Sequence, residues 1–190
     1  MTLKKMNIFR VFDIVLSLLG ILFFSSIIVA IVFMGYFDTG SPIFRQERVG
    51  KCNKPFRLIK FRSMQVNVPS VATHLASASY ITPFGYFLRK SKLDELPQLF
   101  NVLIGDMSFV GPRPNLFNQT ELIEERSKRG VYAIRPGITG LSQINKIDMS
   151  TPQLLAETDA KMINDLNVWY YFKYIFLTVI GKGFGDRVRK

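Results

Sequence analysis

The sequence predicts an α+β protein that is mostly helical, with a membrane helix at its N-terminus and a small folded domain after it. Three observations support this prediction. The 24 residues from Ile14 to Phe37 carry no charge. Pro42–Met64 is typical of two short extended segments around a Gly/Asn/Pro turn, and several later stretches repeat apolar residues at helical spacing. We therefore divide the chain into a membrane segment (1–40) and one domain (41–190).

The uncharged stretch is long enough to cross a membrane. At about 1.5 Å per residue it would extend about 36 Å, more than the ~30 Å of a hydrocarbon core. It is too long for the apolar part of a cleaved signal peptide, and no small-residue cleavage site follows it. Lys and Arg flank both of its ends, and the positive-inside rule places such flanks in the cytoplasm. A helix that turns back at Ser25 and Ser26 satisfies that rule and a single span does not, but charge alone leaves both topologies open.

In the first half of the domain, the sequence predicts a loop and two helices. Residues 65–81 are polar and rich in Ser and Ala, which is typical of a surface loop. Thr82 and Pro83 suit the N-cap and the first position of a short helix. Asp94–Leu103 has apolar residues three and four positions apart. Pro97 is tolerated only near a helix start, and it falls in the first turn of this second helix if Asp94 is the N-cap.

The second half of the domain alternates loops with helices. Ser108–Asn115 is a Pro/Gly loop, and a polar helix follows to about Lys128. Arg135–Asn145 is a Gly-rich loop that leads into a short extended piece, and Thr151 suits the cap of another helix. Val168–Ile180 is apolar and aromatic but too short to span a membrane. It predicts a helix lying at the membrane interface, with a buried core helix as the alternative.

Composition limits the class of partner. The net charge of +11 predicts an anionic partner, which is nucleic acid, an anionic membrane surface or a phosphorylated substrate. The 48% of hydrophobic residues favours the membrane among these three. Nucleic-acid binding also leaves the uncharged stretch unexplained, because the aromatic residues cluster with apolar residues rather than with cations. One cysteine, Cys52, excludes an internal disulfide, and one histidine, His74, makes a Cys/His zinc site or a histidine-based triad a poor fit.

A pair of carboxylates, Asp94 and Glu95, ends a strongly basic segment. From Arg48 to Leu93 there are nine Lys and Arg and no Asp or Glu. A carboxylate kept ionised by cations is a usable nucleophile toward phosphorus, and an adjacent Glu can bind Mg²⁺. The alternative is plain helix capping, because Ser91 and Asp94 fit a capping box.

Cations at separate places in the sequence are candidates for binding phosphate. They lie in or beside segments rich in Gly and Pro, and they are Lys60, Arg62, Arg89 and Arg113. Arginine binds phosphate through two hydrogen bonds and lysine as a point charge. Their scatter over several elements favours a site assembled by folding, with a solvated face or attraction to anionic lipid as the alternatives.

Three long motifs resemble the bacterial monotopic phosphoglycosyl transferases, the bacterial sugar transferase family. They are FRQERVGKCNKPFRLIKFRSM, LRKSKLDELPQLFNVLIGDMSFVGPRPN and RPGITGLSQIN, in that order. The resemblance runs from about Phe12 to Val179, and the chain looks like the minimal catalytic form. It implies an N-terminal re-entrant membrane helix, a small cytoplasmic catalytic domain with short strands, and amphipathic helices at the interface of the bacterial inner membrane.

The resemblance also implies a reaction. Members move a phospho-sugar from a UDP-sugar to polyprenyl (undecaprenyl) phosphate, releasing UMP and starting a lipid-linked glycan. It makes Asp94 the nucleophile, which forms a phosphosugar–aspartyl intermediate, and Glu95 the ligand of Mg²⁺. The implied phosphate contacts are Lys60, Arg62, Arg89 and Arg113, while Arg135 holds the nucleotide or shapes its loop. Membrane lipids and downstream glycosyltransferases are the other expected partners.

The chain departs from the family pattern at two places. Members commonly break the membrane helix with a Ser-Pro pair, where this chain has Ser25-Ser26. After GLSQIN the family often continues with Gly-Arg-Asn, where this chain has Lys146-Ile147-Asp148. Because this region is expected near the sugar, the identity of the donor sugar cannot be inferred from other members of the family. We expect an N-acetylated hexosamine, deoxygenated or not. Asp159 falls near a recurrent family Asp.

Two alternatives to the transferase differ in what they require. A non-catalytic membrane scaffold that binds anionic lipid or a glycosyltransferase has no need of the Asp94-Glu95 pair. A membrane phosphatase with an aspartate nucleophile would pass the phosphosugar to water instead of lipid.

Overall fold

The computed structural model describes residues 3–68 and 78–182, so His74 and part of the predicted 65–81 loop lie outside the described residues. The helices are α1 (Leu3–Thr39), α2 (Pro83–Ser91), α3 (Gln98–Ile104), α4 (Thr120–Lys128), α5 (Leu141–Ile144), α6 (Pro152–Asp165) and α7 (Val168–Val179). The strands are β1 (Ile43–Val49), β2 (Pro55–Phe61), β3 (Ser108–Val110) and β4 (Gly137–Thr139). The prediction of a mostly helical α+β protein with one long apolar N-terminal helix is confirmed.

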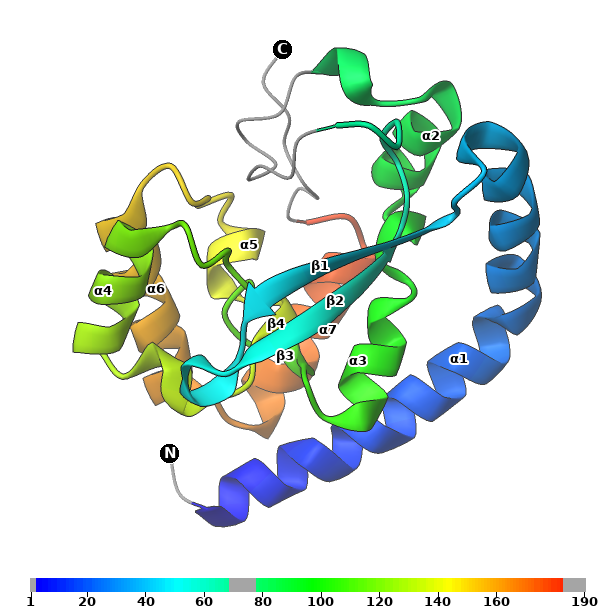
Figure 1. Cartoon of the computed structure of the whole chain (residues 1–190). Helices are drawn as coiled ribbons and strands as arrows, with labels where there is room; N and C mark the ends of the chain where they lie inside the picture. Colours follow the sequence, from blue (N-terminus) through cyan, green and yellow to red (C-terminus); the bar gives the residue numbers. More distant parts are fainter. Residues whose placement is uncertain (1–2, 69–77, 183–190) are drawn as a thin grey trace.

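α1 is one continuous helix that bends around the domain. Its stretch Asn7–Thr39 is long and apolar enough to cross a membrane, by length and composition. In Figure 1 the helix passes below α3 and then turns upward towards α2. Near its middle, Ser25 Oγ donates a hydrogen bond to the carbonyl of Leu22 over 2.8 Å. Such a bond from a serine to the preceding turn is typical of a helix that bends.

The N-terminal part of α1 belongs to the core of the domain. The Asp13 carboxylate accepts hydrogen bonds from Ser108 Oγ at 2.9 Å and from the Phe109 N–H at 3.0 Å. Tyr171 donates its hydroxyl to the same carboxylate at 2.8 Å and stacks on Phe9, with ring centroids 5.2 Å apart. α1 is therefore bound to both β3 and α7.

β1 and β2 pair antiparallel, which confirms the two predicted extended segments. The turn between them holds Cys52 and Asn53 at φ 56° and 58°, a left-handed conformation that few residue types other than glycine adopt easily. Side chains alternate along a strand, so Leu58 and Lys60 of β2 share its buried face. The hairpin thus directs a lysine inward at the end of an apolar row.

The predicted starts of α2 and α6 are in the right places. Thr82 is the N-cap of α2, and its Oγ1 accepts a hydrogen bond from the Gly85 N–H over 2.9 Å. α6 begins at Pro152 directly after Thr151, but the Thr151 hydroxyl does not bond to the first turn of the helix. Proline at the first helical position fixes φ without loss of a backbone bond, which explains why both helices begin there.

The prediction that Asp94 caps a helix is wrong. Asp94 lies in a single 3₁₀ turn, Leu93–Glu95, and α3 begins only after Pro97, which occupies the cap position. Lys92, at φ 59°, ends α2 and redirects the chain into this turn before α3 can start. The capping-box alternative fails as well, because Ser91 Oγ bonds back to carbonyls of its own helix, α2.

α7 has the buried face that the core-helix alternative predicts and an exposed apolar face as well. Tyr171 and Tyr174 are buried in a core cluster with residues of α1 and α6. Trp169, Phe176 and Val179 are largely exposed. One face of this helix therefore completes the core, and the other presents an apolar surface of the kind that suits a membrane interface.

Candidate functional site

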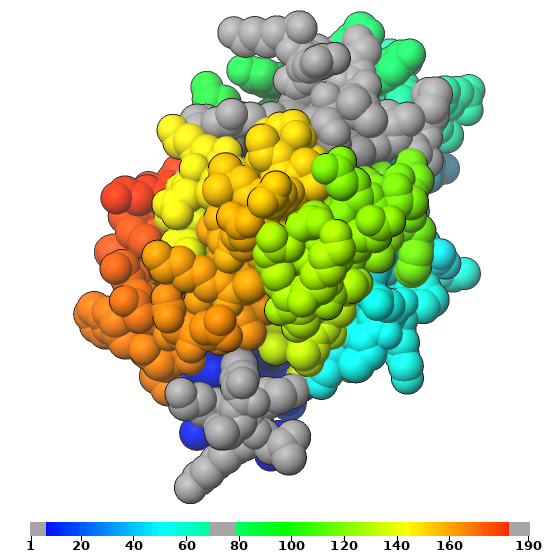
Figure 2. All heavy atoms as spheres, turned by 90° about the vertical axis from the view of Figure 1, so that its left-hand side faces the viewer, coloured from blue at the N-terminus to red at the C-terminus, as the bar shows by residue number. Residues whose placement is uncertain are grey.

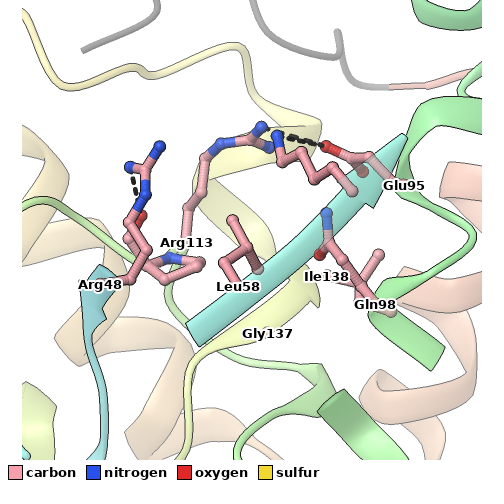
Figure 3. A pocket seen from close by; sticks show the side chains of 9 residues that line it. Arg48, Leu58, Glu95, Gln98, Arg113, Gly137 and Ile138 are labelled. Atoms are coloured by element: carbon pink, nitrogen blue, oxygen red, sulfur yellow. Dashed lines mark hydrogen bonds and ion pairs between the residues drawn. The ribbon is translucent and has the colours of Figure 1, made fainter. Parts of the chain in front are cut away.

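The predicted metal ligand, Glu95, lies in a cavity walled by residues from separate parts of the chain (Figure 3). The elements that meet there are β1, β2, the 3₁₀ turn, α3, the loop after β3, and β4. The lining residues are Arg48, Leu58, Lys60, Glu95, Gln98, Arg113, Pro114, Gly137 and Ile138. Of the four predicted phosphate-binding cations, folding brings Lys60 and Arg113 into this cavity, together with Arg48, which was not predicted.

Two of the predicted phosphate-binding cations hold the Glu95 carboxylate. Arg113 Nη2 lies 3.1 Å from Glu95 Oε1, and Lys60 Nζ lies 3.8 Å from the same oxygen. The Lys60 side chain is only 9% exposed and that of Glu95 14%. A charge this far from water needs an opposite partner, and Glu95 is that partner for both cations.

Asp94 precedes Glu95 in the same 3₁₀ turn and is buried, with 5% of its surface exposed. Successive side chains of a 3₁₀ turn point about 120° apart, so the two carboxylates face different directions. The turn therefore offers two neighbouring acidic groups with different surroundings.

Lys92 is a further cation beside the acidic pair, and the sequence did not single it out. Burial lowers the pKa of its ammonium group, the nearby Glu95 raises that pKa, and Arg113 lowers it. Its position just before the pair was the available signal. It adds positive charge on the α2 side of the turn.

The other predicted cations lie elsewhere. Arg89 Nε donates to Ser63 Oγ at 2.8 Å, and its buried Nη1 has no hydrogen-bond partner among the described residues. Arg62 donates to the Ser41 carbonyl at 2.7 Å and stacks over the Phe44 ring, which ties the link between α1 and β1 to the end of the hairpin. Arg135 donates to the Gly105 carbonyl at 2.7 Å, at the C-terminal end of α3. In the described part, neither Arg62 nor Arg135 lines the Glu95 cavity.

Two glycines allow β3 and β4 to approach closely and so fix the loop that carries Arg113. A Cβ added to Gly137 would lie 2.0 Å from the nitrogen of Gly111, and one added to Gly111 would lie 2.5 Å from the carbonyl oxygen of Arg135. The Gly137 N–H also donates to the Pro112 carbonyl at 2.9 Å. The Pro-Arg-Pro segment therefore leaves the strand pair in one direction, toward Glu95.

A buried arginine, Arg126 of α4, supports the same loop from behind. Its Nη1 donates to the carbonyl of Arg113 at 2.9 Å and to Asn115 Oδ1 at 2.8 Å. Its Nε and Nη2 both donate to Asp159 Oδ2 on α6, at 3.1 and 2.7 Å. Ser142 Oγ bonds to the other oxygen of Asp159 at 2.6 Å. Figure 2 shows α4 and α6 side by side on this face.

Sequence reasoning missed Arg126 and assigned Asp159 no role. The signal for Arg126 was present, because it lies four residues after Leu122 and thus on the apolar face of a polar helix. A charged residue on a buried face predicts a buried partner. The partner itself, 33 residues away, could not be identified from spacing.

The site suits a metal ion that is bound together with substrate. The described residues contain no group of three or more His, Cys, Asp or Glu that could hold a metal by itself. Mg²⁺ commonly takes only one or two protein carboxylates and completes its shell with water and substrate phosphates. Glu95, with Asp94 next to it, matches that limited donor set.

Comparisons with known proteins identify the family. The model of the bacterial sugar transferases matches residues 4–183. The chain is 41% identical over 190 residues to the UDP-glucose:undecaprenyl-phosphate glucose-1-phosphate transferase of Escherichia coli K12, covering 94% of this chain and 40% of that protein. It is 34% identical over 188 residues to the UDP-N-acetylgalactosamine-undecaprenyl-phosphate N-acetylgalactosaminephosphotransferase of Aeromonas hydrophila, covering 94% and 44%.

A shorter relative matches along most of its length. The uncharacterized sugar transferase EpsL of Bacillus subtilis 168 is 36% identical over 171 residues, which are 90% of this chain and 84% of that protein. The chain thus spans about two fifths of the two longer relatives but most of EpsL. With a family match over nearly all of its residues, the chain belongs to the bacterial sugar transferase family.

Proposed function

We propose that this chain transfers a sugar phosphate from a UDP-sugar to undecaprenyl phosphate and releases UMP. The observation that carries the proposal is the Glu95 cavity, where Lys60 and Arg113 converge on one carboxylate beside a second, buried carboxylate. A diphosphate needs cations to neutralise it, and transfer through the enzyme needs a nucleophile. The names of the two longer relatives state this class of reaction for those proteins.

The proposed reaction has two steps at one phosphorus atom. In the first, a carboxylate oxygen of Asp94 bonds to the β-phosphorus of the donor, the bond from that phosphorus to the bridging oxygen breaks, and UMP leaves. In the second, a phosphate oxygen of undecaprenyl phosphate bonds to the same phosphorus and the Asp94 carboxylate leaves. Each step exchanges one P–O bond for another, so no oxidant or reductant is needed. Arg113 and Lys60 bind the phosphate oxygens in both steps.

Glu95 has a separate part in this proposal. Together with oxygens of the bound diphosphate, it would hold Mg²⁺, which when bound neutralises the charge of the phosphates. Glu95 is also the partner that Lys60 and Arg113 keep while no donor is bound. Binding of an anionic donor thus replaces one set of charge contacts by another.

We further propose that α1 is re-entrant and holds the domain at the cytoplasmic face of the bacterial inner membrane. Its bend around the domain and its largely exposed apolar side chains, such as Phe23 and Phe37, support this placement. Cations at both ends of the apolar stretch favour a return to the same side. Membrane lipids would contact α1 and the exposed face of α7, and a downstream glycosyltransferase would take up the lipid-linked product.

The test is UMP release from a panel of UDP-sugars by the purified protein with undecaprenyl phosphate and Mg²⁺, with lipid product followed in parallel. We expect release with matching lipid product from one donor class, abolished by Asp94→Asn and by EDTA. Asp165→Asn, an exposed aspartate on α6, is the matched control and keeps full activity. Without acceptor, intact-protein mass spectrometry should show one added phosphosugar on the wild type and none on Asp94→Asn.

Other results would point to the alternatives. Phosphosugar delivered to water instead of lipid indicates a phosphatase. No turnover with any donor favours a scaffold. Turnover that survives Asp94→Asn contradicts the covalent intermediate.

A further inference from the structure

The side chain of Gln98 lines the Glu95 cavity with its amide unused. Gln98 is the first residue of α3, three positions after Glu95, and only 4% of its surface is exposed. Figure 3 shows its side chain in the cavity wall opposite Arg113. Among the described residues, no side chain or backbone group makes a hydrogen bond to this amide. The amide therefore has both a donor and an acceptor available to a bound molecule.

Gln98 is buried as a residue, but its amide is not a sealed polar group, because in the described part of the chain its nitrogen and oxygen are not among the buried side-chain atoms without a hydrogen-bond partner. The amide faces the cavity, where water or a bound molecule can reach it. The same helix shows what a structural amide looks like. Asn101, almost one turn later, is fully buried and has its hydrogen bonds made. Its Nδ2 donates to the Arg57 carbonyl at 2.8 Å and to Asp106 Oδ2 at 3.3 Å, and its Oδ1 accepts from the Ile59 N–H at 3.0 Å. α3 thus satisfies the amide that holds the fold together and leaves the amide at the cavity unbonded.

The surroundings of Gln98 indicate what kind of group it binds. The charged lining residues around it suit phosphate, and Leu58 and Ile138 are apolar. Gln98 is the uncharged polar side chain of the cavity lining in the described part of the chain. A carboxamide can donate to an oxygen and accept from a hydroxyl at the same time, which a cation cannot do.

We infer that Gln98 binds an oxygen of the transferred phosphosugar, a sugar hydroxyl rather than a phosphate oxygen. This inference rests on the proposed function. It makes Gln98 a specificity-determining residue, because a site that hydrogen-bonds a substrate hydroxyl discriminates against donors that lack it. In the free protein the Gln98 amide makes no hydrogen bond because the sugar hydroxyl that it binds is absent.

Stability is the first test. Replacing an amide that makes no hydrogen bond within the described protein by an apolar side chain of similar shape removes no bond from the fold. In detergent, Gln98→Met should melt at or above the wild-type temperature. Asn101→Leu is the matched control on the same helix, and it should lower the melting temperature by on the order of 5 °C or more, because three hydrogen bonds are lost. A clear drop for Gln98→Met would mean that the amide serves the fold and would overturn the inference.

Enzyme activity is the second test, and it distinguishes a contact with a sugar hydroxyl from a contact with a phosphate oxygen. Gln98→Met should lower kcat/KM about tenfold, the typical effect of one neutral hydrogen bond. Gln98→Glu keeps an acceptor for a hydroxyl but repels phosphate, so we expect it to be more active than Gln98→Met. A Gln98→Glu enzyme less active than Gln98→Met would assign the amide to a phosphate oxygen and overturn the hydroxyl assignment.

Deoxy-sugar donors complete the design. If Gln98 contacts one hydroxyl, the wild type and Gln98→Met should use the donor lacking that hydroxyl equally well, because the contact is absent in both. A wild type that turns over UDP-sugars, with Gln98→Met equally active on every donor, would overturn the inference and leave the proposed function intact. A wild type that turns over no UDP-sugar would overturn both.

Discussion

Arg126 and Asp159 form an ion pair, with Nη2 and Oδ2 2.7 Å apart, whose side chains are 1% and 0% exposed. The pair joins α4 to α6 behind the loop that carries Arg113. It is connected to Asn115, Ser142 and, through Asn115, to the hydroxyl of Tyr132. Burial of two charges requires that their hydrogen bonds be made, and here nearly every available group is bonded.

Removal of one partner of this pair should strongly destabilise the protein. Asp159→Asn leaves the Arg126 guanidinium buried without a counter-charge, and we expect a loss of about 3–5 kcal/mol in the free energy of unfolding. The measurement is denaturant or thermal unfolding in detergent. Lys128→Gln, which breaks an exposed ion pair with Glu125 on the same helix, is the control and should leave the unfolding midpoint unchanged. Equal effects of the two variants would contradict this prediction.

Arg113 should require its planar shape as well as its charge. Arg113→Lys keeps the charge but cannot bond to two phosphate oxygens at once, so we expect kcat/KM to fall at least about tenfold with little change in stability. The measurement is the rate of UMP release over a series of donor concentrations. Arg57→Lys, on the exposed face of β2, should retain wild-type kinetics. Full activity of Arg113→Lys would show that only a point charge is needed there.

Glu95 should set the magnesium requirement. In Glu95→Gln the carboxylate is lost, so we expect the Mg²⁺ concentration for half-maximal UMP release to rise at least about tenfold. Lys60 and Arg113 also lose their counter-charge, so the melting temperature without substrate should fall. Glu47→Gln, an exposed glutamate of β1, is the control for both measurements. An unchanged Mg²⁺ dependence in Glu95→Gln would exclude Glu95 as the metal ligand.

The hydroxyl of Tyr171 should contribute to holding α1 on the domain. Burial raises the pKa of this phenol, so it remains a hydrogen-bond donor to Asp13 at all ordinary pH values. Tyr171→Phe keeps the ring stack on Phe9 and removes one hydrogen bond, which should cost about 1 kcal/mol of unfolding free energy. Tyr170→Phe, on the neighbouring position of α7, should cost less. If Tyr171→Phe leaves the free energy of unfolding unchanged, the hydrogen bonds from Ser108 and Phe109 are sufficient for Asp13.

Local patterns in the sequence predicted much of the fold. The uncharged stretch, the turn at residues 50–54 and the Thr-Pro helix starts at residues 82 and 151 correspond to α1, the β1–β2 hairpin, α2 and α6. These features depend on a few neighbouring residues, so short-range reasoning finds them. The cap at Asp94 was wrong because a left-handed residue, Lys92, inserts a 3₁₀ turn that no spacing rule anticipates.

The sequence predicted several of the charged residues of the site, but it predicted less of how they are arranged in space. Lys60, Glu95 and Arg113 were selected from residue type and local context, and they meet in one cavity. Arg62 was selected on the same grounds, but its guanidinium bonds to Ser41 in the link between α1 and β1. Pairings such as Arg126 with Asp159 join distant helices, so they follow from tertiary packing and not from any local pattern.

α3 connects the Glu95 cavity at its N-terminal end with α1 at its C-terminal end. Its first residue, Gln98, lies in the cavity, while its last carbonyls, those of Val102 and Leu103, accept hydrogen bonds from Arg10 of α1. A seven-residue helix is stiff, so a tilt of α1 is transmitted along it to the turn that carries the acidic pair. α1 is thus part of the structural support of the domain and is not merely attached to it. Removal of α1 would therefore take away a support of α3 and, with it, of the turn that carries Glu95.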